Sequence, residues 1–374
     1  MMKGPTHRSA PTLRQEETLS LPHGGNIYHY SRMFGIPPEQ FLDFSASINP
    51  LGPSPAAMKA IREGLPSLVN YPDPDYGLLK GAISAHLGVA RESLLVGNGS
   101  TELIYLLPRV IAPWKALVFA PSFSDYERAC RLAGAKISFF PLTEKTGFLP
   151  DMDKLKAALQ GVDLFFVCNP NNPTGVLLDK SVLLDILKLA KKAGAFTVVD
   201  EAFIEYAPGK SILPEAASYM NVAVLRNFTK FYGMPGLRAG YVVAHPSVIK
   251  KLEAAKEPWS VNTLAERAVV AALSDASHAK KSLRLVENEK NYLYGELSRI
   301  PGLYPYSPSV NFMLVKIVKK GLDAATLTET LASKGILIRD CTNFRGLGCG
   351  FIRVAVKTRA ENKFLIDVLK GVIL

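Results

Sequence analysis

The chain has 374 residues with a formal net charge of +11, and 48 % of them are hydrophobic. This length suits two domains, and the hydrophobic fraction supports a sizeable core. The basic residues are spread along the chain and are not interleaved with aromatic residues, which argues against a nucleic-acid-binding surface. We expect a solvated basic surface, with a few arginines directed at a phosphorylated ligand.

No apolar stretch has the length of a membrane span. Residues 1–22 are polar, of mixed charge and without an apolar signal core, and they predict a flexible tail on a cytoplasmic protein. The four cysteines, Cys130, Cys168, Cys341 and Cys349, show no metal-ligand spacing with nearby histidines. They predict buried free thiols in a reducing compartment and no metal site.

The middle of the chain alternates short apolar runs with amphipathic stretches. This alternation predicts an α/β fold in which a mostly parallel central sheet carries helices on both faces. In such sheets, ligands bind at the carboxyl ends of the strands. Residues 182–193 show helical spacing, and the runs that predict buried strands are 94–96, 116–120, 137–140, 164–168, 196–199, 222–225 and 241–244.

The composition changes toward the C-terminus. Residues 260–300 show helical spacing with a break near 274–277, and Pro301 marks the change. A small α+β domain is predicted beyond Pro301 by strand-like runs at 310–317, 336–339 and 352–356, a helix-like stretch at 324–334 and a terminal helix. We therefore expect a tail at 1–22, a segment at 23–60 that joins the small domain, a large domain at 61–265 and a small domain at 266–374.

Lys230 follows the apolar run 222–225 and precedes a turn rich in glycine and proline. A lysine at a strand end in an apolar setting loses its proton more readily, because burial disfavours the charged form. A neutral amine attacks an aldehyde to form a Schiff base, which is how pyridoxal-5′-phosphate (PLP) enzymes hold their cofactor. Lys230 is therefore a candidate catalytic and cofactor-binding residue.

Two side chains at other predicted strand ends suit the same cofactor. Asp200 ends the run 196–199. Its carboxylate is either an ordinary cap or ion-pair partner, or the group that keeps a pyridine nitrogen protonated. Asn172 lies in Asn169-Pro170-Asn171-Asn172-Pro173-Thr174-Gly175, a turn-forming segment that is more specific than a turn requires. Its amide is a suitable donor to a phenolate oxygen.

The segment Gly97-Asn98-Gly99-Ser100-Thr101-Glu102 follows a predicted strand and opens a predicted helix. A glycine turn with Ser and Thr is a common helix cap, but the same geometry cradles a phosphate with backbone N–H groups and the helix dipole. Arg238 is suited to neutralise that phosphate. Phe123 follows the run 116–120 and either belongs to the core or stacks on a cofactor ring; its position alone favours the core.

The order of these features resembles the fold-type-I PLP enzymes, which share the aspartate-aminotransferase fold. The resemblance extends from about His23 to the C-terminus. It implies a Schiff base on Lys230, a pyridine contact at Asp200 and an O3′ contact at Asn172. The implied cofactor-binding set is completed by Gly99, Ser100, Thr101, Phe123, Thr229 and Arg238. Enzymes of this type are usually homodimers with shared sites, and Tyr71 resembles the tyrosine that reaches the cofactor phosphate of the neighbouring subunit.

The segments Asp200-Glu201-Ala202-Phe203 and 335–340 are similar to the histidinol-phosphate aminotransferase-like branch of this fold. Other segments resemble threonine-phosphate decarboxylases of cobalamin biosynthesis, namely His23-Gly24-Gly25-Asn26, 43–53, 258–262 and 339–344. The first and last of these discriminate most between the two groups. The second resemblance implies decarboxylation of L-threonine O-3-phosphate to (R)-1-amino-2-propanol O-2-phosphate.

The same resemblance implies the substrate-binding residues. Arg353 corresponds to the arginine that binds the substrate carboxylate, and His23 and Arg339 are placed for the substrate phosphate, with Asn49 in the same set. Guanidinium groups suit both anions. Taken by position alone, His23 is also consistent with a surface histidine, and both arginines with surface ion pairs.

Two positions depart from the pattern of the aminotransferases. Phe203 stands where many of them have a tyrosine that hydrogen-bonds O3′, which mildly favours the decarboxylase. Asn227 stands where Ser or Thr often contacts the cofactor phosphate, so an amide would have to donate there in place of a hydroxyl. A histidinol-phosphate or related aminotransferase remains the alternative. A PLP-sensing regulator would need a DNA-binding module ahead of His23, and 22 residues are too few for one.

Overall fold

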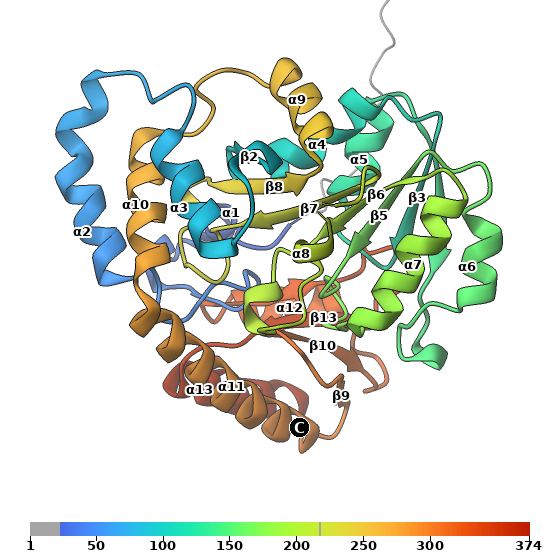
Figure 1. Ribbon diagram of the computed structural model, residues 1–374. Coiled ribbons are helices and arrows are strands. Elements are labelled where there is room, and N and C mark those ends of the chain that lie inside the picture. Colours follow the sequence, from blue (N-terminus) through green and yellow to red (C-terminus); the bar gives the residue numbers. More distant parts are fainter. Residues whose placement is uncertain (1–22, 217) are drawn as a thin grey trace, which may run out of the picture.

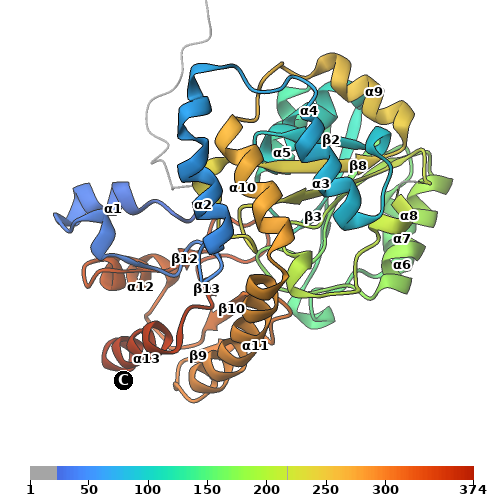
Figure 2. The same cartoon turned by 60° about the vertical axis from the view of Figure 1, so that its left-hand side comes forward.

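The computed structural model describes residues 23–216 and 218–374 (Figures 1 and 2). The expected tail at 1–22 lies outside the described residues. A seven-stranded sheet with the order β2-β8-β7-β6-β5-β3-β4 forms the centre, and β8 runs antiparallel to both of its neighbours. The mostly parallel sheet confirms the predicted fold class. Its strands are β2 (Leu94–Gly97), β3 (Lys115–Ala120), β4 (Lys136–Pro141), β5 (Leu164–Cys168), β6 (Phe196–Asp200), β7 (Val222–Asn227) and β8 (Gly240–Ala244).

Helices cover both faces of this sheet (Figure 1). Alternate strand residues point to opposite faces, so Leu94 packs into one apolar cluster and Leu95 into the other. This two-sided burial explains why the strands read as continuous apolar runs. One face is covered by α4 (Gly99–Ile111), α5 (Asp125–Leu132) and α9 (Pro246–Ala255). The other is covered by α3 (Gly77–Leu87), α6 (Met152–Ala158), α7 (Lys180–Lys192), α8 (Leu213–Ala216) and α10 (Thr263–Ser274), with α2 (Pro55–Gly64) packed on α10.

A second sheet is antiparallel, with the order β12-β13-β10-β9. Together with three helices it encloses an apolar cluster of its own, which also contains the fully buried Phe44 of the N-terminal segment. That segment contains α1 (Ile27–Phe34) and β1 (Leu42–Asp43). The other elements here are β9 (Leu303–Pro305), β10 (Phe312–Ile317), β12 (Arg339–Asp340), β13 (Phe351–Ala355), α11 (Ala276–Ser298), α12 (Ala324–Ala332) and α13 (Arg359–Ile373).

The strand expected at 336–339 is in fact two strands in two sheets. In β11 (Ile336–Leu337), Leu337 pairs in parallel with Asp43 of β1. Two residues later, Arg339 of β12 pairs with Arg353 of β13 in the antiparallel sheet. The apolar run favours extended backbone, but pairing partners far away in sequence decide where one strand ends and the next begins. The break places Arg339 directly opposite Arg353.

Two further expectations can be compared with the structure. Cys130, Cys168 and Cys341 are buried free thiols, whereas Cys349 is exposed and so departs from the expected burial. Within residues 23–216 and 218–374, no helix combines the length and the apolar character that crossing a bilayer requires.

Candidate active site

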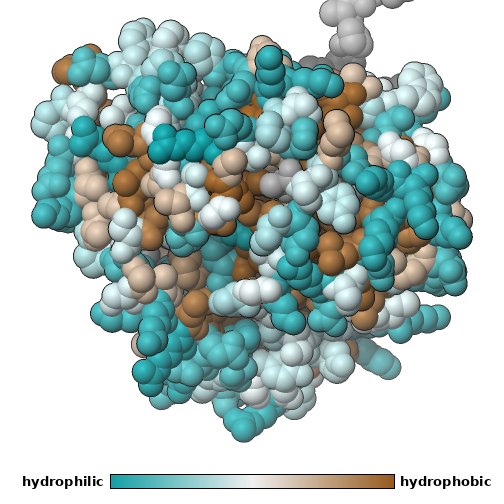
Figure 3. Space-filling model, viewed as in Figure 1, coloured by the Kyte–Doolittle hydropathy of each residue, from teal (hydrophilic) through white to brown (hydrophobic). Residues whose placement is uncertain are grey.

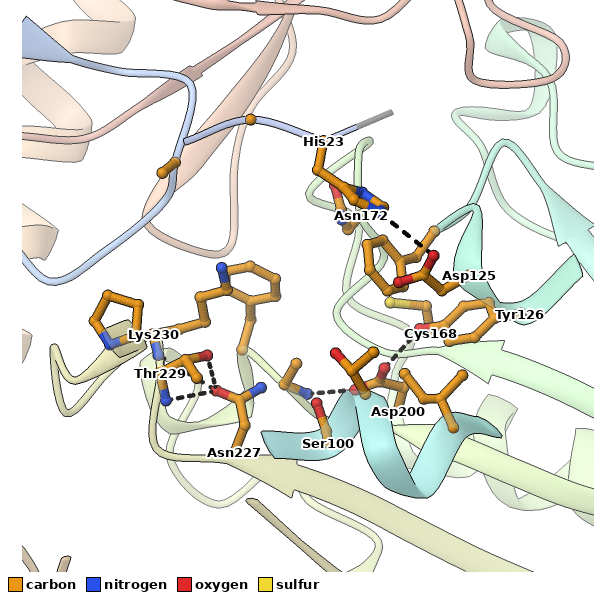
Figure 4. A pocket seen from close by; sticks show the side chains of 18 of the residues that line it. His23, Ser100, Asp125, Tyr126, Cys168, Asn172, Asp200, Asn227, Thr229 and Lys230 are labelled. Atoms are coloured by element: carbon orange, nitrogen blue, oxygen red, sulfur yellow. Dashed lines mark hydrogen bonds and ion pairs between the residues drawn. The ribbon is translucent and has the colours of Figure 1, made fainter. Parts of the chain in front are cut away.

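A cavity of about 610 Å³ lies at the carboxyl ends of β5, β6 and β7 (Figure 4). Its walls come from these strand ends, from the first turns of α4 and α5, and from the small sheet. The position agrees with the general rule for ligand sites in parallel sheets. The predicted site residues that line it are His23, Ser100, Thr101, Phe123, Asn172, Asp200, Thr229, Lys230, Arg238, Arg339 and Arg353.

Lys230 lies in the turn that follows β7, and its side chain reaches the cavity. The turn is shaped by Asn227, whose side-chain oxygen accepts the backbone N–H and the hydroxyl of Thr229 (3.0 and 2.7 Å) and the N–H of Lys230 (3.3 Å). Such local bonds are typical of Asn in turns. Burial, together with the positive charges of Arg353 and Arg238, lowers the pKa of Lys230 to about 8.

Asp200 forms part of the cavity wall at the end of β6, beside Cys168 of β5. Its Oδ2 accepts the hydroxyl of Tyr126 (2.7 Å) and its Oδ1 accepts the N–H of Ala202 (2.9 Å). Burial raises the pKa of Asp200 to about 6, and these two donors act in the opposite direction because they stabilise the carboxylate. The side chain is therefore fixed at both oxygens and is mostly ionised at neutral pH.

A buried ion pair lies directly behind the cavity and connects β6 to β7. Arg226 donates from Nε and Nη2 to Oε2 of Glu201 (3.0 and 2.9 Å), and its Nη2 also donates to the hydroxyl of Ser211. Glu205 lies 3.8 Å from the same guanidinium, and burial raises its pKa to about 7. Because Glu201 follows Asp200 and Arg226 precedes the Lys230 turn, the pair fixes the two strand ends relative to each other.

The N-terminus of α4 and Arg238 form a cradle for an anion. Ser100 and Thr101 of the first helical turn line the cavity together with Arg238. The φ of Gly99 is +76°, a backbone conformation that favours glycine, and Nη2 of Arg238 lies 2.5 Å from the position that a Cβ would take. Backbone N–H groups at a helix start, combined with a guanidinium, are a site for a phosphate.

Asn172 and Phe123 face the space between the cradle and the small sheet. The side-chain oxygen of Asn172 accepts a hydrogen bond from Nη1 of Arg353, so the part of the amide that can serve a ligand is its NH2 group. This agrees with the donor role predicted for Asn172. Phe123 lines the cavity and packs edge-on against Tyr126 at 5.6 Å, so it contacts both the core and the site.

Arg339 and Arg353 form the opposite wall. They are direct partners across β12 and β13, and both are almost fully buried (6 % exposed each). Arg353 donates to the carbonyl of Ser45 (2.9 Å) and lies over the ring of Phe312. Arg339 donates to the side chain of Asn343 (2.7 Å). Burial lowers the pKa of both, that of Arg353 to about 10, and both remain cationic at neutral pH.

Residues 23–26, called the N-terminal arm, form the third side of the cavity. His23 Nε2 lies 3.4 Å from Oδ1 of Asp125, and its ring lies 5.3 Å from that of Phe123. Figure 4 shows the imidazole and the Asp125 carboxylate directed at each other across the cavity mouth. His23 thus lines the cavity while 39 % of its side chain stays exposed.

Three predicted residues are not part of the lining: Gly99, which precedes Ser100 beside Arg238, and Asn49 and Tyr71, which lie elsewhere. Asn49 donates its amide hydrogens to the carbonyl of Phe231 (2.7 Å) and the hydroxyl of Ser282 (2.8 Å), and its oxygen accepts the N–H of Leu51. The backbone N–H of Asn49 also bonds the carbonyl of Lys230, so the residue supports the lysine turn from behind and does not contact the cavity. Tyr71 is 82 % exposed on the surface and its ring packs against Trp259 at 5.0 Å.

Sequence reasoning missed several residues that line or support the site. Tyr126 follows Phe123 by three residues at a helix start, a spacing that places both on one side. Ser45 and Asp125 carry no such signal, because their partners Arg353 and His23 are distant in sequence.

The residues present fit PLP. A partly buried lysine with a lowered pKa, a carboxylate held by two donors, an amide donor and an anion cradle line one cavity. Lys230 would bind the cofactor covalently. Asp200 would contact its ring nitrogen and Asn172 its phenolic oxygen. The phosphate would be bound by Ser100, Thr101, Thr229 and Arg238. The observation that fits a phosphate most directly is that Arg238 meets the first turn of α4 in the cavity wall.

Comparison with known proteins agrees with this site. Residues 39–369 match the family model for aminotransferase class I and II. The chain is 35 % identical over 94 % of its length to the threonine-phosphate decarboxylase of Salmonella typhimurium, covering 96 % of that protein. A protein of Caldanaerobacter subterraneus subsp. tengcongensis, provisionally named threonine-phosphate decarboxylase, is 39 % identical, with 93 % of both chains covered.

Among solved structures, the histidinol-phosphate aminotransferase of Clostridium acetobutylicum superposes with a TM-score of 0.82 at 32 % identity, covering 88 % of this chain and 98 % of that one. The fold, the site and these matches agree from one end of the described chain to the other. The chain belongs to the aminotransferase class I and II family, whose members are PLP-dependent enzymes.

Proposed function

We propose that this protein decarboxylates L-threonine O-3-phosphate to (R)-1-amino-2-propanol O-2-phosphate, a precursor of the aminopropanol linker of cobalamin. The observation that supports the proposal is the pairing of Arg339 with Arg353 in neighbouring strands. Side chains directly opposite each other in an antiparallel pair have Cβ atoms about 4.5–5.5 Å apart. Two adjacent guanidinium groups suit a small substrate whose carboxylate and phosphate lie close together. Histidinol phosphate carries a phosphate but no carboxylate, so in an aminotransferase the carboxylate-binding arginine would serve only the keto-acid cosubstrate.

The named residues divide the chemistry among them. PLP, when bound, supplies an electron-withdrawing ring that stabilises negative charge at the substrate α-carbon. Asp200 keeps the ring nitrogen protonated, and its two hydrogen bonds keep it a carboxylate. Arg353 orients the substrate carboxylate, while Arg339 and His23 bind the phosphate. The Lys230 amine, with a pKa of about 8, is suited to hold a proton and return it to the α-carbon once CO2 has left.

The deciding experiment omits any keto acid. Purified protein is incubated with PLP and L-threonine O-3-phosphate, and CO2 and aminopropanol phosphate are measured. We expect both products in equal amounts. Release of no CO2, together with amino transfer that depends on an added keto acid, would refute the decarboxylase assignment.

A histidinol-phosphate aminotransferase remains the second candidate. The similarity to the Clostridium acetobutylicum enzyme supports it, since 98 % of that chain is covered. The test is to supply histidinol phosphate with 2-oxoglutarate and to measure glutamate. Glutamate formation at a rate above that of CO2 release from L-threonine O-3-phosphate would favour this candidate.

We also infer a homodimer in which Tyr71 reaches the partner's cofactor phosphate. Exposed apolar side chains gather around the connection from α2 to α3, and large exposed apolar surfaces usually mark interfaces. Figure 3 shows apolar surface on the side of the molecule where α2, α3 and α10 lie. The exposed residues are Leu65, Leu68, Val69, Tyr71, Leu78 and Trp259. Light scattering should give twice the chain mass of 40.7 kDa, and Tyr71→Phe should weaken PLP binding without changing that mass.

A further inference from the structure

One acidic residue in the cavity has no role in the proposed reaction. Apart from Asp200, which serves the cofactor, the charged residues of the lining are basic with the exception of Asp125. Asp125 is the first residue of α5 and only 6 % exposed. A carboxylate beside a phosphate site weakens anion binding unless another group compensates its charge.

The group in the cavity that lies against Asp125 is His23. Its Nε2 lies 3.4 Å from Oδ1 of Asp125, and the hydroxyl of Tyr105 lies at the same distance from that oxygen. The imidazole also packs on the ring of Phe123, with the planes inclined by 36°. Among the residues that the structure describes, Nδ1 of His23 has no hydrogen-bond partner. The nitrogen held by Asp125 and the nitrogen open to a ligand are therefore different atoms.

The backbone of His23 is fixed as well. The side chain of Asn26 donates to the carbonyl of His23, and the N–H of Gly25 donates to the hydroxyl of Ser45 (2.8 Å). Gly24 lies so close to Ser45 that a Cβ would be 2.2 Å from its carbonyl oxygen. The same carbonyl accepts the hydrogen bond from Arg353. Ser45 thus holds the backbone next to His23 and also positions Arg353.

We propose that Asp125 is a positioning residue for His23. Asp125 holds Nε2, and the imidazole presents Nδ1–H to the phosphate of the substrate. Contacts with Phe123 and the packing of residues 24–25 on Ser45 restrain the ring further. This assignment rests on the proposed function, because it takes the phosphate end of the cavity as the place of the substrate phosphate. The two glycines after His23 have separate reasons: Gly24 lies against Ser45, and Gly25 has a φ of +84°.

The two possible roles of Asp125 predict opposite changes in phosphate affinity when its carboxylate is replaced by an amide. If Asp125 only repels the phosphate, Asp125→Asn tightens phosphate binding. If it positions His23, the same change weakens binding, since a neutral amide holds the imidazole less firmly than a carboxylate does.

The experiment titrates the holoenzyme calorimetrically with inorganic phosphate, which is not turned over, and measures kcat and KM for L-threonine O-3-phosphate. We expect Asp125→Asn and His23→Gln each to weaken phosphate binding by roughly tenfold, about 1.4 kcal/mol. The double variant should bind no more weakly than His23→Gln alone, because the two residues act as a unit. Each substitution should raise KM more than it lowers kcat.

Glu127→Gln is the matched control. It removes a carboxylate from the same first turn of α5, but Glu127 pairs with Arg131 and Arg345 outside the cavity. It should leave phosphate binding unchanged. If Asp125→Asn does not fold, Asp125→Ser replaces it, since serine also suits a helix start. Tighter binding, unchanged binding or additive losses in the double variant each overturn the assignment.

The outcomes separate this assignment from the proposed function. If the wild-type enzyme releases no CO2 from L-threonine O-3-phosphate but shows the expected pattern with inorganic phosphate, the proposed function fails and the role of Asp125 stands. If CO2 is released and Asp125→Asn binds phosphate like the wild type, only the role of Asp125 fails.

Discussion

The two ends of the cavity are built in different ways. The cofactor end is formed by the ends of β5, β6 and β7, adjacent strands of one sheet, and by the first turn of α4. The other end, called the substrate end after its proposed role, is formed by residues 23–26, the carbonyl of Ser45 and the β12–β13 pair. These segments come from opposite ends of the chain (Figure 2). The first end depends on local strand geometry, and the second depends on long-range packing. Substitutions should therefore act differently at the two ends.

The largest effect is expected at the cofactor end, from Lys230→Ala. Loss of the amine should lower activity by roughly 10⁴-fold, the upper range for one proton-transferring group, and should abolish the covalent adduct trapped by borohydride. Mass spectrometry of the reduced protein provides the measurement. Lys256→Ala is the control, because burial also lowers the pKa of this lysine but the residue lies outside the cavity. An adduct that persists in Lys230→Ala would disprove the assignment.

Next in size is Glu201→Gln, which tests the ion pair behind the cofactor end. It leaves Arg226 buried beside a neutral amide, and such a loss costs about 3–5 kcal/mol. Glu205 is close enough to compensate in part, so we expect the lower end of that range. Urea unfolding gives the free energy. Glu215→Gln, which removes a more exposed pair with Lys180, should cost less than about 1 kcal/mol. A loss below about 1 kcal/mol in Glu201→Gln would show that the buried pair is not important for stability.

Substitutions of Arg353 and Arg339 at the substrate end should affect the binding of different ligands. Arg353→Gln should lower kcat/KM for L-threonine O-3-phosphate by roughly 10²-fold, as removal of a partner from a buried charge pair does. It should also weaken the binding of L-threonine, which has the carboxylate but no phosphate. Arg339→Gln should spare L-threonine binding and weaken only the phosphorylated substrate. A loss of L-threonine binding in Arg339→Gln alone would exchange the two assignments.

The most gradual effect is a pH dependence of stability in the cofactor-free protein. The folded-state pKa of Lys230 is lowered to about 8, from 10.5. Between these values the unfolded chain binds more protons, so stability should rise with pH, by at most about 1.4 kcal/mol per pH unit. Lys230→Met should be more stable than the wild type below pH 8, and the difference should shrink toward pH 10.5. A difference that stays constant across this window would rule out the lowered pKa.

The same contrast explains what could be read from the sequence. Asp200, Lys230 and the loop at Gly99 follow apolar runs, so strand ends and glycine turns were enough to place them together. The seven strands of the large sheet were predicted for the same reason. His23, Arg339 and Arg353 were identified through family resemblance, because no local pattern brings an N-terminal residue to a C-terminal sheet.

The errors of the sequence reading have the same origin. Asn49 lies in a segment that resembles the decarboxylases, yet its amide is used to hold Phe231 and Ser282, which only a folded structure reveals. The contacts of Ser45 and Asp125 escaped notice because each is a single polar residue whose partner is distant. The division of 336–339 into two strands escaped notice because the whole run is extended and mostly apolar.

The division of residues 336–339 into two strands fixes the side of the small sheet on which Arg339 lies. Only Ile338 separates Leu337, paired with Asp43, from Arg339, paired with Arg353. Gain or loss of one residue here would turn Arg339 to the opposite face of the small sheet, because side-chain direction alternates along a strand. The guanidinium would leave the cavity while every cofactor contact stayed in place. If Arg339 binds the substrate phosphate as proposed, the length of this short connection matters for substrate selection as well as its composition.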